Sequence, residues 1–131
     1  MNNKNNQSNK EKNLKDLFIK NSNEKIGKIE IANSFIKRFR GLMLKRRYDY
    51  PLLFEIPQDI QIKERSSIHS LFMRFELTLV FIDGDDLIYE IADLKPWKYY
   101  IPQKRAKYII EFDRNEFENY DLKIGDEIEL K

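Results

Sequence analysis

The chain has no cysteine and only one histidine, His69, among its 131 residues. Disulfides, thiol nucleophiles, iron–sulfur clusters and cysteine-ligated zinc sites are therefore excluded. A metal site built from several histidines of one chain is excluded for the same reason. Any serine–histidine or general-base chemistry would depend on His69 alone. The residues give no reason to expect a metal ion or an organic cofactor.

Long hydrophobic runs are also absent, because no apolar stretch approaches the roughly 18–20 residues that span a bilayer. The first 13 residues lack the apolar core of a secretory signal. These two observations predict a cytoplasmic protein with no membrane partner. The four glycines are scattered, so neither standard phosphate-binding loop is present.

An excess of charge of one sign is missing as well. The 24 basic and 22 acidic residues leave a formal net charge of +2, so only a local basic cluster would argue for nucleic acid. The length suits one domain with a real core. Residues 1–13 contain Met1 as their only apolar residue, which predicts a disordered tail. We therefore expect a single compact β-rich domain over residues 14–131.

Most of the chain has the pattern of short β-strands. Ile29 and Ile31 alternate with Lys28 and Glu30, which predicts a strand with one wet face. Further strands are predicted by short apolar runs at 52–56, 66–73, 77–83, 87–94, 106–113 and 127–130. Residues 14–20 suit either a short helix or a first strand. The run at 77–83 is apolar on both faces, so we expect it to be covered on both.

Three other segments complete the pattern. Residues 83–86, Asp-Gly-Asp-Asp, predict a hairpin turn rather than a cation loop, because the further ligands of an EF-hand are missing. Residues 114–122 predict one or two helical turns. The aromatic stretch between Pro96 and Pro102 is interpreted as a connection that packs over one end of the sheet.

The most basic segment of the chain is predicted to be a helix. Asn33 and Ser34 offer side-chain oxygens to cap it. Its apolar stripe is formed by Phe35, Ile36, Phe39, Leu42 and Met43. The remaining positions of the 37–47 stretch are rich in arginine and lysine. Two interpretations stay open for it: a solvated helix face that docks on the core, and a surface that binds phosphates.

Together these patterns predict an α+β fold that is mainly β, with a small barrel-like antiparallel or mixed sheet and one or two short helices. Closure of the sheet would remove the exposed strand edges. We expect one shared core that buries Phe54, Leu79, Phe81, Tyr108, Ile110 and Phe112.

The order of several motifs resembles a known family. Arg40-Gly41-Leu42-Met43 is followed by LLFEI, SIHSLFMRFELTLVFID, KP, AKYIIEF and a final GD. This order, over residues 26–130, resembles the "domain of unknown function 192" family in its archaeal form. The resemblance implies a compact β-rich fold and no established reaction. The family's Pro-x-Asp step is here Glu76-Leu77-Thr78, so any role of that aspartate does not carry over to Thr78.

The residues favour a non-catalytic binding or accessory module over an enzyme. The expected groove lies near the Arg40-Gly41-Leu42-Met43 helix, and its predicted lining residues are Arg40, Met43, His69, Met73 and Glu76. The expected ligand is a small molecule, a peptide or a protein. Arg40 lies at the margin of the apolar stripe, where its guanidinium forms either an ion pair with Asp83, Glu111 or Glu76, or a clamp for an anionic ligand.

Two other functions remain open. One is a hydrolytic or isomerising enzyme that uses His69 as the acid or base and Arg40 to hold an anionic substrate. The other is RNA binding through the 37–47 helix together with the aromatic and basic stretch at 95–105.

Overall fold

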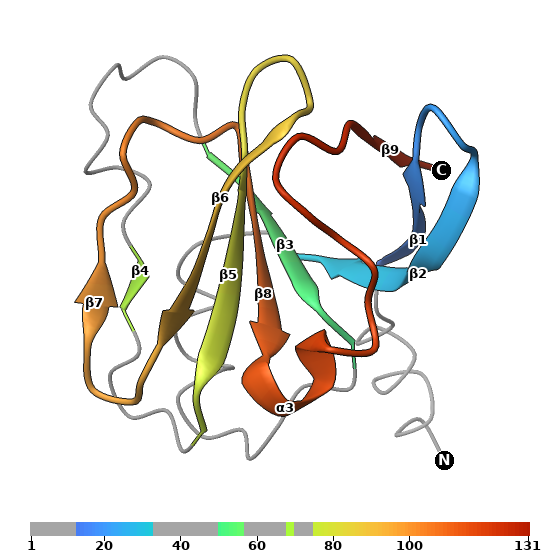
Figure 1. Cartoon of the computed structure of the whole chain (residues 1–131). Helices are drawn as coiled ribbons and strands as arrows, with labels where there is room; N and C mark the ends of the chain where they lie inside the picture. Colours follow the sequence, from blue (N-terminus) through green and yellow to red (C-terminus); the bar gives the residue numbers. More distant parts are fainter. Residues whose placement is uncertain (1–12, 33–49, 57–67, 70–74) are drawn as a thin grey trace, which may run out of the picture.

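Two β-sheets and one short helix make up the described part of the chain (Figure 1). The computed structural model describes residues 13–32, 50–56, 68–69 and 75–131. The elements are β1 (Leu14–Ile19), β2 (Glu24–Ile31), β3 (Leu52–Glu55), β4 (Ile68–His69), β5 (Leu77–Ile82), β6 (Ile88–Leu94), β7 (Tyr99–Tyr100), β8 (Tyr108–Asp113), α3 (Arg114–Phe117) and β9 (Ile128–Leu130). The predicted mainly β, α+β class is confirmed.

The larger sheet is mixed, with the strand order β6-β5-β8-β3-β2-β1-β9. Among the described strands, β2 and β3 form the only parallel pair, and the other neighbours are antiparallel. For residues 14–20 the sequence suited either a short helix or a strand, and the structure has a strand there, β1. The predicted hairpin is also present, because β5 pairs with β6 across the turn at 83–86.

The predicted closure into a barrel is wrong, although the two edge strands approach each other. Leu87, next to β6, pairs with Glu127, next to β9, as one isolated bridge. The amide of Ile88 donates to the Asp126 carbonyl at 2.9 Å, and the amide of Ile128 donates to the Asp86 carbonyl at 2.9 Å. Because this bridge is antiparallel, residues 89–94 of β6 would have to pair with residues 120–125, and these form a turn and irregular chain instead of a strand, so the ladder does not continue along β6.

The core is divided by the sheet into two clusters, so the expectation of one shared core is also wrong. Phe54, Leu79 and Phe81 belong to the cluster on one face. Ile110 and Phe112 belong to the cluster on the other face, against which the half-buried Tyr108 packs. Adjacent residues of a strand point to opposite faces, and the central strands are covered on both. All six residues of β5 are buried, as its apolar pattern predicted.

One helical turn, α3, follows β8 directly. Asp113 caps it, because its side chain accepts a hydrogen bond from the Asn115 amide at 3.0 Å. Phe117 of this turn packs edge-on against Phe112, with ring centroids 5.0 Å apart. No described helix is long and apolar enough to cross a bilayer.

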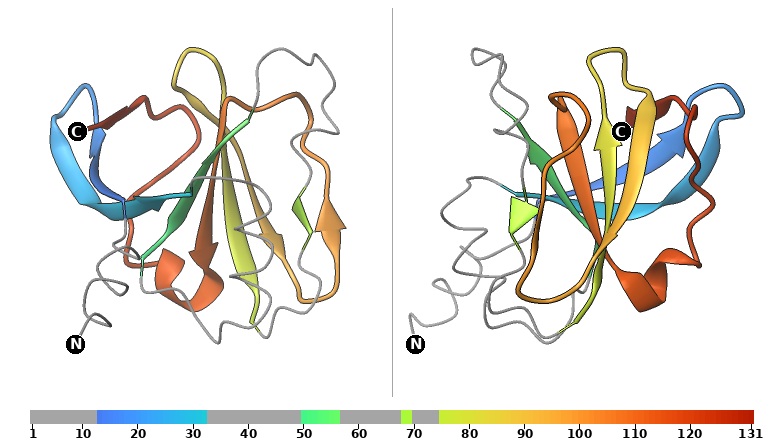
Figure 2. Two further views of the ribbon diagram at one scale, coloured as in Figure 1. Left: turned by 180° about the vertical axis from the view of Figure 1, so that it is seen from behind. Right: turned by 60° about the vertical axis from the view of Figure 1, so that its left-hand side comes forward.

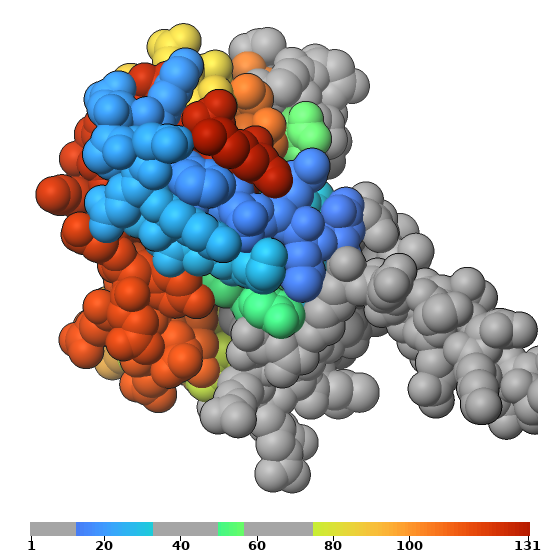
Figure 3. Space-filling view, turned by 90° about the vertical axis from the view of Figure 1, so that its right-hand side faces the viewer, coloured from blue at the N-terminus to red at the C-terminus, as the bar shows by residue number. Residues whose placement is uncertain are grey.

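The smaller sheet lies on one side of the molecule, and the β1, β2 and β9 part of the larger sheet lies on the other. Figures 1 and 2 place β4 and β7 at the side away from β1, β2 and β9. In the space-filling view, β9 lies beside β1 and β2 on the outer surface (Figure 3). The predicted 37–47 helix lies outside the described residues, and only residue 13 of the predicted N-terminal tail is described. Both therefore stay predictions.

Candidate functional site

The smaller sheet joins the histidine strand to the aromatic segment. Its two strands are antiparallel, with Ile68 opposite Tyr100 and His69 opposite Tyr99. The sequence placed these segments more than 25 residues apart and gave the aromatic one no strand. Residues 99–100 are therefore a strand rather than a plain connection, and the backbone of His69 lies next to them.

An exposed row of large side chains runs along this segment. Trp97, Tyr99 and Ile101 are 57%, 62% and 38% exposed, and we call these three residues the aromatic surface. Tyr100 is half-buried and Pro102 is buried. From Tyr99 to Pro102 this alternation has the period of two of an extended chain, whereas Trp97 and Lys98 just before it are both exposed. In the described part of the chain the one other large apolar side chain so exposed is Ile124.

A buried carboxylate anchors the inner side of the same segment. Glu90, on β6, is only 5% exposed. It accepts hydrogen bonds from the Tyr100 hydroxyl and from the Gln103 amide, the latter at 2.8 Å. A carboxylate so buried needs such donors to offset its lost hydration. The hydrogen bond to Glu90, together with burial, raises the pKa of Tyr100 to about 12.

Aromatic packing extends this anchor into the core. The Phe81 ring lies 5.7 Å from the Tyr100 ring and 6.2 Å from the Tyr89 ring, measured between centroids. The Tyr89 hydroxyl donates to the Lys104 carbonyl at 2.6 Å. Burial, followed by the charges of Glu90 and Asp83, raises the pKa of Tyr89 well above its ordinary value. The aromatic surface is thus carried on a segment tied to β6 at three points.

The turn that starts this segment holds a tryptophan in an unusual backbone conformation. Trp97 follows Pro96 in a turn and has a φ of +67°. Proline followed by a residue with positive φ is the arrangement of a type II turn, in which glycine is favoured at the second position. A bulky residue there strains the backbone, and such strain often marks a functional position.

The aromatic surface lies in a stretch without acidic residues. No Asp or Glu occurs between Asp93 and Glu111, whereas Lys95, Lys98, Lys104, Arg105 and Lys107 all lie there. Lys104 Nζ lies 3.5 Å from Asp83 Oδ2, and Lys107 Nζ lies 3.1 Å from Asp86 Oδ1. Lys95 and Lys98 flank Trp97 and are exposed. The positive charge nearest the aromatic surface is therefore that of Lys95 and Lys98.

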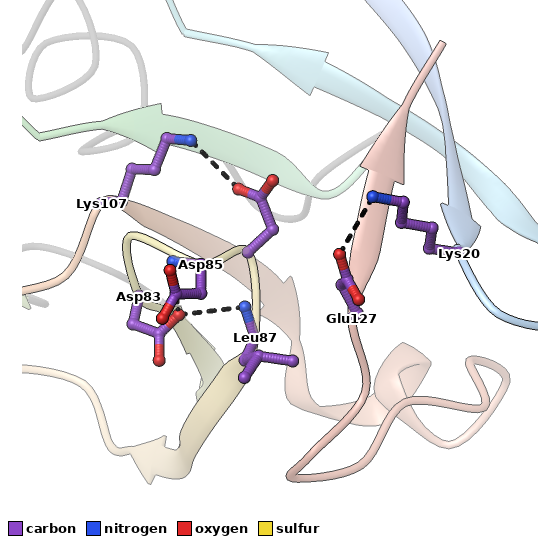
Figure 4. Close-up of polar contacts among 7 residues, drawn as sticks. Lys20, Asp83, Asp85, Leu87, Lys107 and Glu127 are labelled. Carbon is purple, nitrogen blue, oxygen red and sulfur yellow. Dashed lines mark hydrogen bonds and ion pairs between the residues drawn. The ribbon is translucent and has the colours of Figure 1, made fainter.

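The hairpin aspartates have a structural role (Figure 4). Asp83 Oδ1 accepts hydrogen bonds from the amides of Asp85 and Leu87, at 2.9 and 3.1 Å. Figure 4 also shows Lys20 paired with Glu127 at 3.2 Å, near the place where the two sheet edges meet. Within the described residues, no three His, Cys, Asp or Glu side chains are grouped as metal ligands.

Thr78, which stands where the family pattern has an aspartate, is buried and paired. Its hydroxyl donates to Asp93 Oδ1 at 2.8 Å. Asp93 Oδ2 accepts from Arg114 Nε at 3.0 Å. Thr78 and Asp93 lie directly opposite each other on β5 and β6. The carboxylate that contacts Thr78 therefore comes from Asp93 on the neighbouring strand.

The predicted groove residues are only partly placed. His69 lies in the smaller sheet, whereas Glu76 is half-buried at the start of β5, where its carbonyl accepts from the Arg114 amide at 2.9 Å. His69 thus belongs to the smaller sheet, whereas Glu76 directly precedes a strand of the larger one. Arg40, Met43 and Met73 lie outside the described residues, so their place in a groove stays a prediction.

The sequence pointed to the aromatic and basic stretch at 95–105 only within the RNA-binding alternative, through its aromatic residues between Pro96 and Pro102. It did not predict the strand at 99–100, the outward position of Trp97, Tyr99 and Ile101, or the anchor Glu90. Glu90 carries no comparable signal. Its burial depends on the return of the distant segment at 99–103.

Comparison with known proteins places the chain in a family. The model of DUF192, described as "Uncharacterized ACR", matches residues 17–130. The chain belongs to the DUF192 family. The predicted family resemblance is thereby confirmed, and the family's description assigns it no reaction.

DUF192 relatives from archaea are similar over most of the chain. A UPF0127 protein of Pyrococcus horikoshii is 41% identical over 102 residues, which are 78% of this chain and 86% of the relative. One from Pyrococcus furiosus is 38% identical over 77% of this chain and 84% of the relative. One from Thermococcus sibiricus is 37% identical over 79% of this chain and 66% of the relative.

Two solved structures share the fold of this DUF192 chain. A crystal structure of a candidate transcription regulator from Sinorhizobium meliloti has a TM-score of 0.72 and 19% identity, and the match covers 91% of this chain and 95% of that one. A protein of unknown function from Novosphingobium aromaticivorans has a TM-score of 0.66 and 14% identity, over 88% and 83%. At these identities the likeness supports the fold alone.

Proposed function

We propose that this DUF192 chain is a non-catalytic binding module that holds an anionic ligand at the aromatic surface. The observation that carries the proposal is the pairing of an exposed aromatic row with a buried anchor on the same segment. Trp97 and Tyr99 are more than half exposed, while Tyr100, the residue after Tyr99, donates a hydrogen bond to the buried Glu90. Large apolar side chains held outward on an ordered strand are typical of an interaction site.

The charge around the aromatic surface supports an anionic ligand. Lys95 and Lys98 are exposed on either side of Trp97. The nearest acidic residue in sequence, Asp93, is already paired with Arg114 and Thr78. A small molecule, a peptide or a protein with negative charge would meet lysines here without facing an unpaired carboxylate from Asp93.

The proposed site is centred on the aromatic surface, whereas the groove predicted from the sequence lay near the Arg40-Gly41-Leu42-Met43 helix. His69 stays part of the site because its backbone is paired with Tyr99. Arg40, Met43, Met73 and Glu76 stay predicted lining residues. A cytoplasmic location also stays a prediction.

A thermal-shift screen with matched variants tests this function. The panel holds nucleotides, amino acids, small carboxylates, acidic peptides and short oligonucleotides, at fixed protein concentration. A ligand at 100 times its dissociation constant stabilises by about 2.7 kcal/mol, which raises the melting temperature of a domain this size by several degrees. We expect a hit for the parent chain and for Ile124→Ala, which removes an exposed apolar side chain elsewhere.

The decisive variant is Trp97→Gly. Glycine suits the positive φ of this position, so the variant should fold at least as well while it loses the indole. The hit should therefore disappear in Trp97→Gly. A hit that survives this change, or a screen without any hit, would overturn the proposal.

A further inference from the structure

We infer that the anionic ligand of the aromatic surface is a single-stranded nucleic acid, with bases stacked on Trp97 and Tyr99 and phosphates held by Lys95 and Lys98. This inference rests on the proposed function and narrows it to one class of ligand. Exposed aromatic platforms beside a cationic path are the parts that bind single strands without sequence preference.

The distribution of charge supplies the path for the phosphates. The chain as a whole is nearly neutral, yet residues 94–110 contain five basic and no acidic side chains. The exposed lysines at the start of this stretch, Lys95 and Lys98, flank Trp97. Phosphate contacts are therefore expected at the turn.

The spacing of the aromatic rings fits successive bases. Trp97 and Tyr99 are two residues apart, on the exposed side of a segment whose Tyr100 faces inward. Trp97 lies in the turn at 96–97 and Tyr99 begins β7, so their Cα atoms are at most about 7 Å apart, the reach of two fully extended residues. Neighbouring nucleotides of one strand therefore reach both rings. Every base has a π face, so this stacking tolerates any sequence.

The anchor makes the platform rigid before the ligand arrives. Glu90 holds both Tyr100 and the Gln103 amide, and so it fixes the segment on either side of Ile101. The Trp97 backbone is held at a φ of +67°, a conformation that is unfavourable for a bulky residue. A preorganised platform loses less conformational freedom on binding. The carboxylates of an acidic peptide would pair with Lys95 and Lys98. Such a peptide has no bases to stack on the rings of Trp97 and Tyr99.

The single tryptophan of the chain makes a direct test possible. Trp97 is the only tryptophan, so its fluorescence reports on this surface alone. The probe is an oligothymidylate of about ten nucleotides, added to the full chain, a length within the usual range for such sites. We expect saturable quenching of Trp97. Tyr99→Ala should weaken binding by about tenfold while the tryptophan still reports.

The charge and ring contributions are separated by further variants. Lys95→Glu with Lys98→Glu should weaken binding and flatten the slope of log affinity against log salt by about 0.7 for each lost phosphate contact. Trp97→Gly, followed by anisotropy of a labelled oligonucleotide, should lose at least tenfold in affinity. Lys123→Glu, at an exposed lysine in the 123–126 turn, is the matched control and should change neither affinity nor slope.

The outcomes distinguish this inference from the proposed function. If polyglutamate or another panel ligand quenches Trp97 and oligothymidylate does not, the nucleic-acid inference is overturned and the binding function stands. If nothing quenches Trp97 and the thermal screen is flat, both are overturned. If the oligonucleotide binds equally well to Trp97→Gly and to the double lysine variant, it binds elsewhere, and the inference is again overturned.

Discussion

Glu90 and Trp97 lie in the environments that their side chains ordinarily avoid. A carboxylate is rarely buried and an indole is rarely left in solvent. Glu90 is 5% exposed, whereas Trp97 is 57% exposed. The two are linked, because the buried carboxylate fastens the segment that carries the exposed ring. The burial of Glu90 and the exposure of Trp97 each cost free energy. The packing and hydrogen bonds of the surrounding fold offset both costs.

The first prediction concerns Phe81, which is fully buried and packs against the rings of Tyr89 and Tyr100. Phe81→Ala should lower the free energy of unfolding by about 3–5 kcal/mol, because it leaves a cavity in a closely packed cluster. Urea denaturation measures this change. Phe18→Ala, at a half-buried position on β1, should cost clearly less. Equal effects would show that β5 is not the centre of this cluster.

The second prediction concerns pH. The Glu90 hydrogen bond raises the pKa of Tyr100 from 10.0 to about 12, so folding favours the neutral phenol. The resulting stability is complete below about pH 10 and is lost as the pH rises towards about 12. Tyr100→Phe should therefore differ from the parent in its stability slope over this window, as measured by urea denaturation. Tyr99→Phe, at the exposed neighbour, is the matched control.

If Tyr100→Phe and Tyr99→Phe gave the same slope, the Glu90 anchor would not act as described. Lys107 also has a raised pKa, caused first by its hydrogen bond to Asp86. Its contribution is present in the parent and in both variants, so it cancels in the comparison.

Among the elements, the β5–β6 hairpin shows how a turn is fixed by one side chain. Asp83 accepts two backbone N–H groups within the turn, whereas the Asp85 side chain is exposed. An aspartate that bonds the backbone two residues on is a common turn device. The same turn supplies Asp83 and Asp86 to Lys104 and Lys107, and so it fixes one end of the basic segment.

The third prediction compares two aspartates of this turn. Asp83→Ala should lower the free energy of unfolding by about 1–2 kcal/mol, because two amides lose their acceptor. Asp85→Ala makes the same change in charge and should cost less than about 0.5 kcal/mol. Chemical denaturation of both variants gives the answer. A larger effect at Asp85 would contradict the assigned hydrogen bonds.

For the whole molecule, the chief feature is a sheet whose two edges meet without closing. The bridge between Leu87 and Glu127 joins β6 to β9, and Ile128 is buried beside it. The opposite side of the molecule carries the smaller sheet and the aromatic surface (Figure 1). The proposed binding surface is thus remote from the place where the chain ends meet the sheet.

The fourth prediction tests this junction. Ile128→Ala should cost about 2–5 kcal/mol, because it removes a buried side chain at the meeting of the two edges. The Ile88 amide, which donates to the Asp126 carbonyl, should then exchange its hydrogen faster. Hydrogen exchange followed by NMR measures this. Leu130→Ala, at a half-buried position, should leave Ile88 protected; unchanged exchange in Ile128→Ala would show that the edges are not coupled.

The sequence by itself determined the local elements. Alternation and turn residues located the strands around Ile29, the hairpin at 83–86 and the single helical turn after Asp113. These features depend on neighbouring residues and on backbone preference, which any stretch of chain carries with it. The mainly β class and the family followed from the same patterns.

Only the tertiary structure decided which segments meet. It pairs His69 with Tyr99, separates Phe54 from Phe112 by placing them on opposite faces, and buries Glu90 under a segment ten residues away. It also leaves the sheet open, because the residues that precede β9 turn away from β6 instead of pairing along it. Strand pairing and face are set by long-range packing, and a one-residue change of register exchanges the two faces. The sequence therefore offers the 95–105 stretch as one alternative site, and only the fold decides which of its side chains face outward.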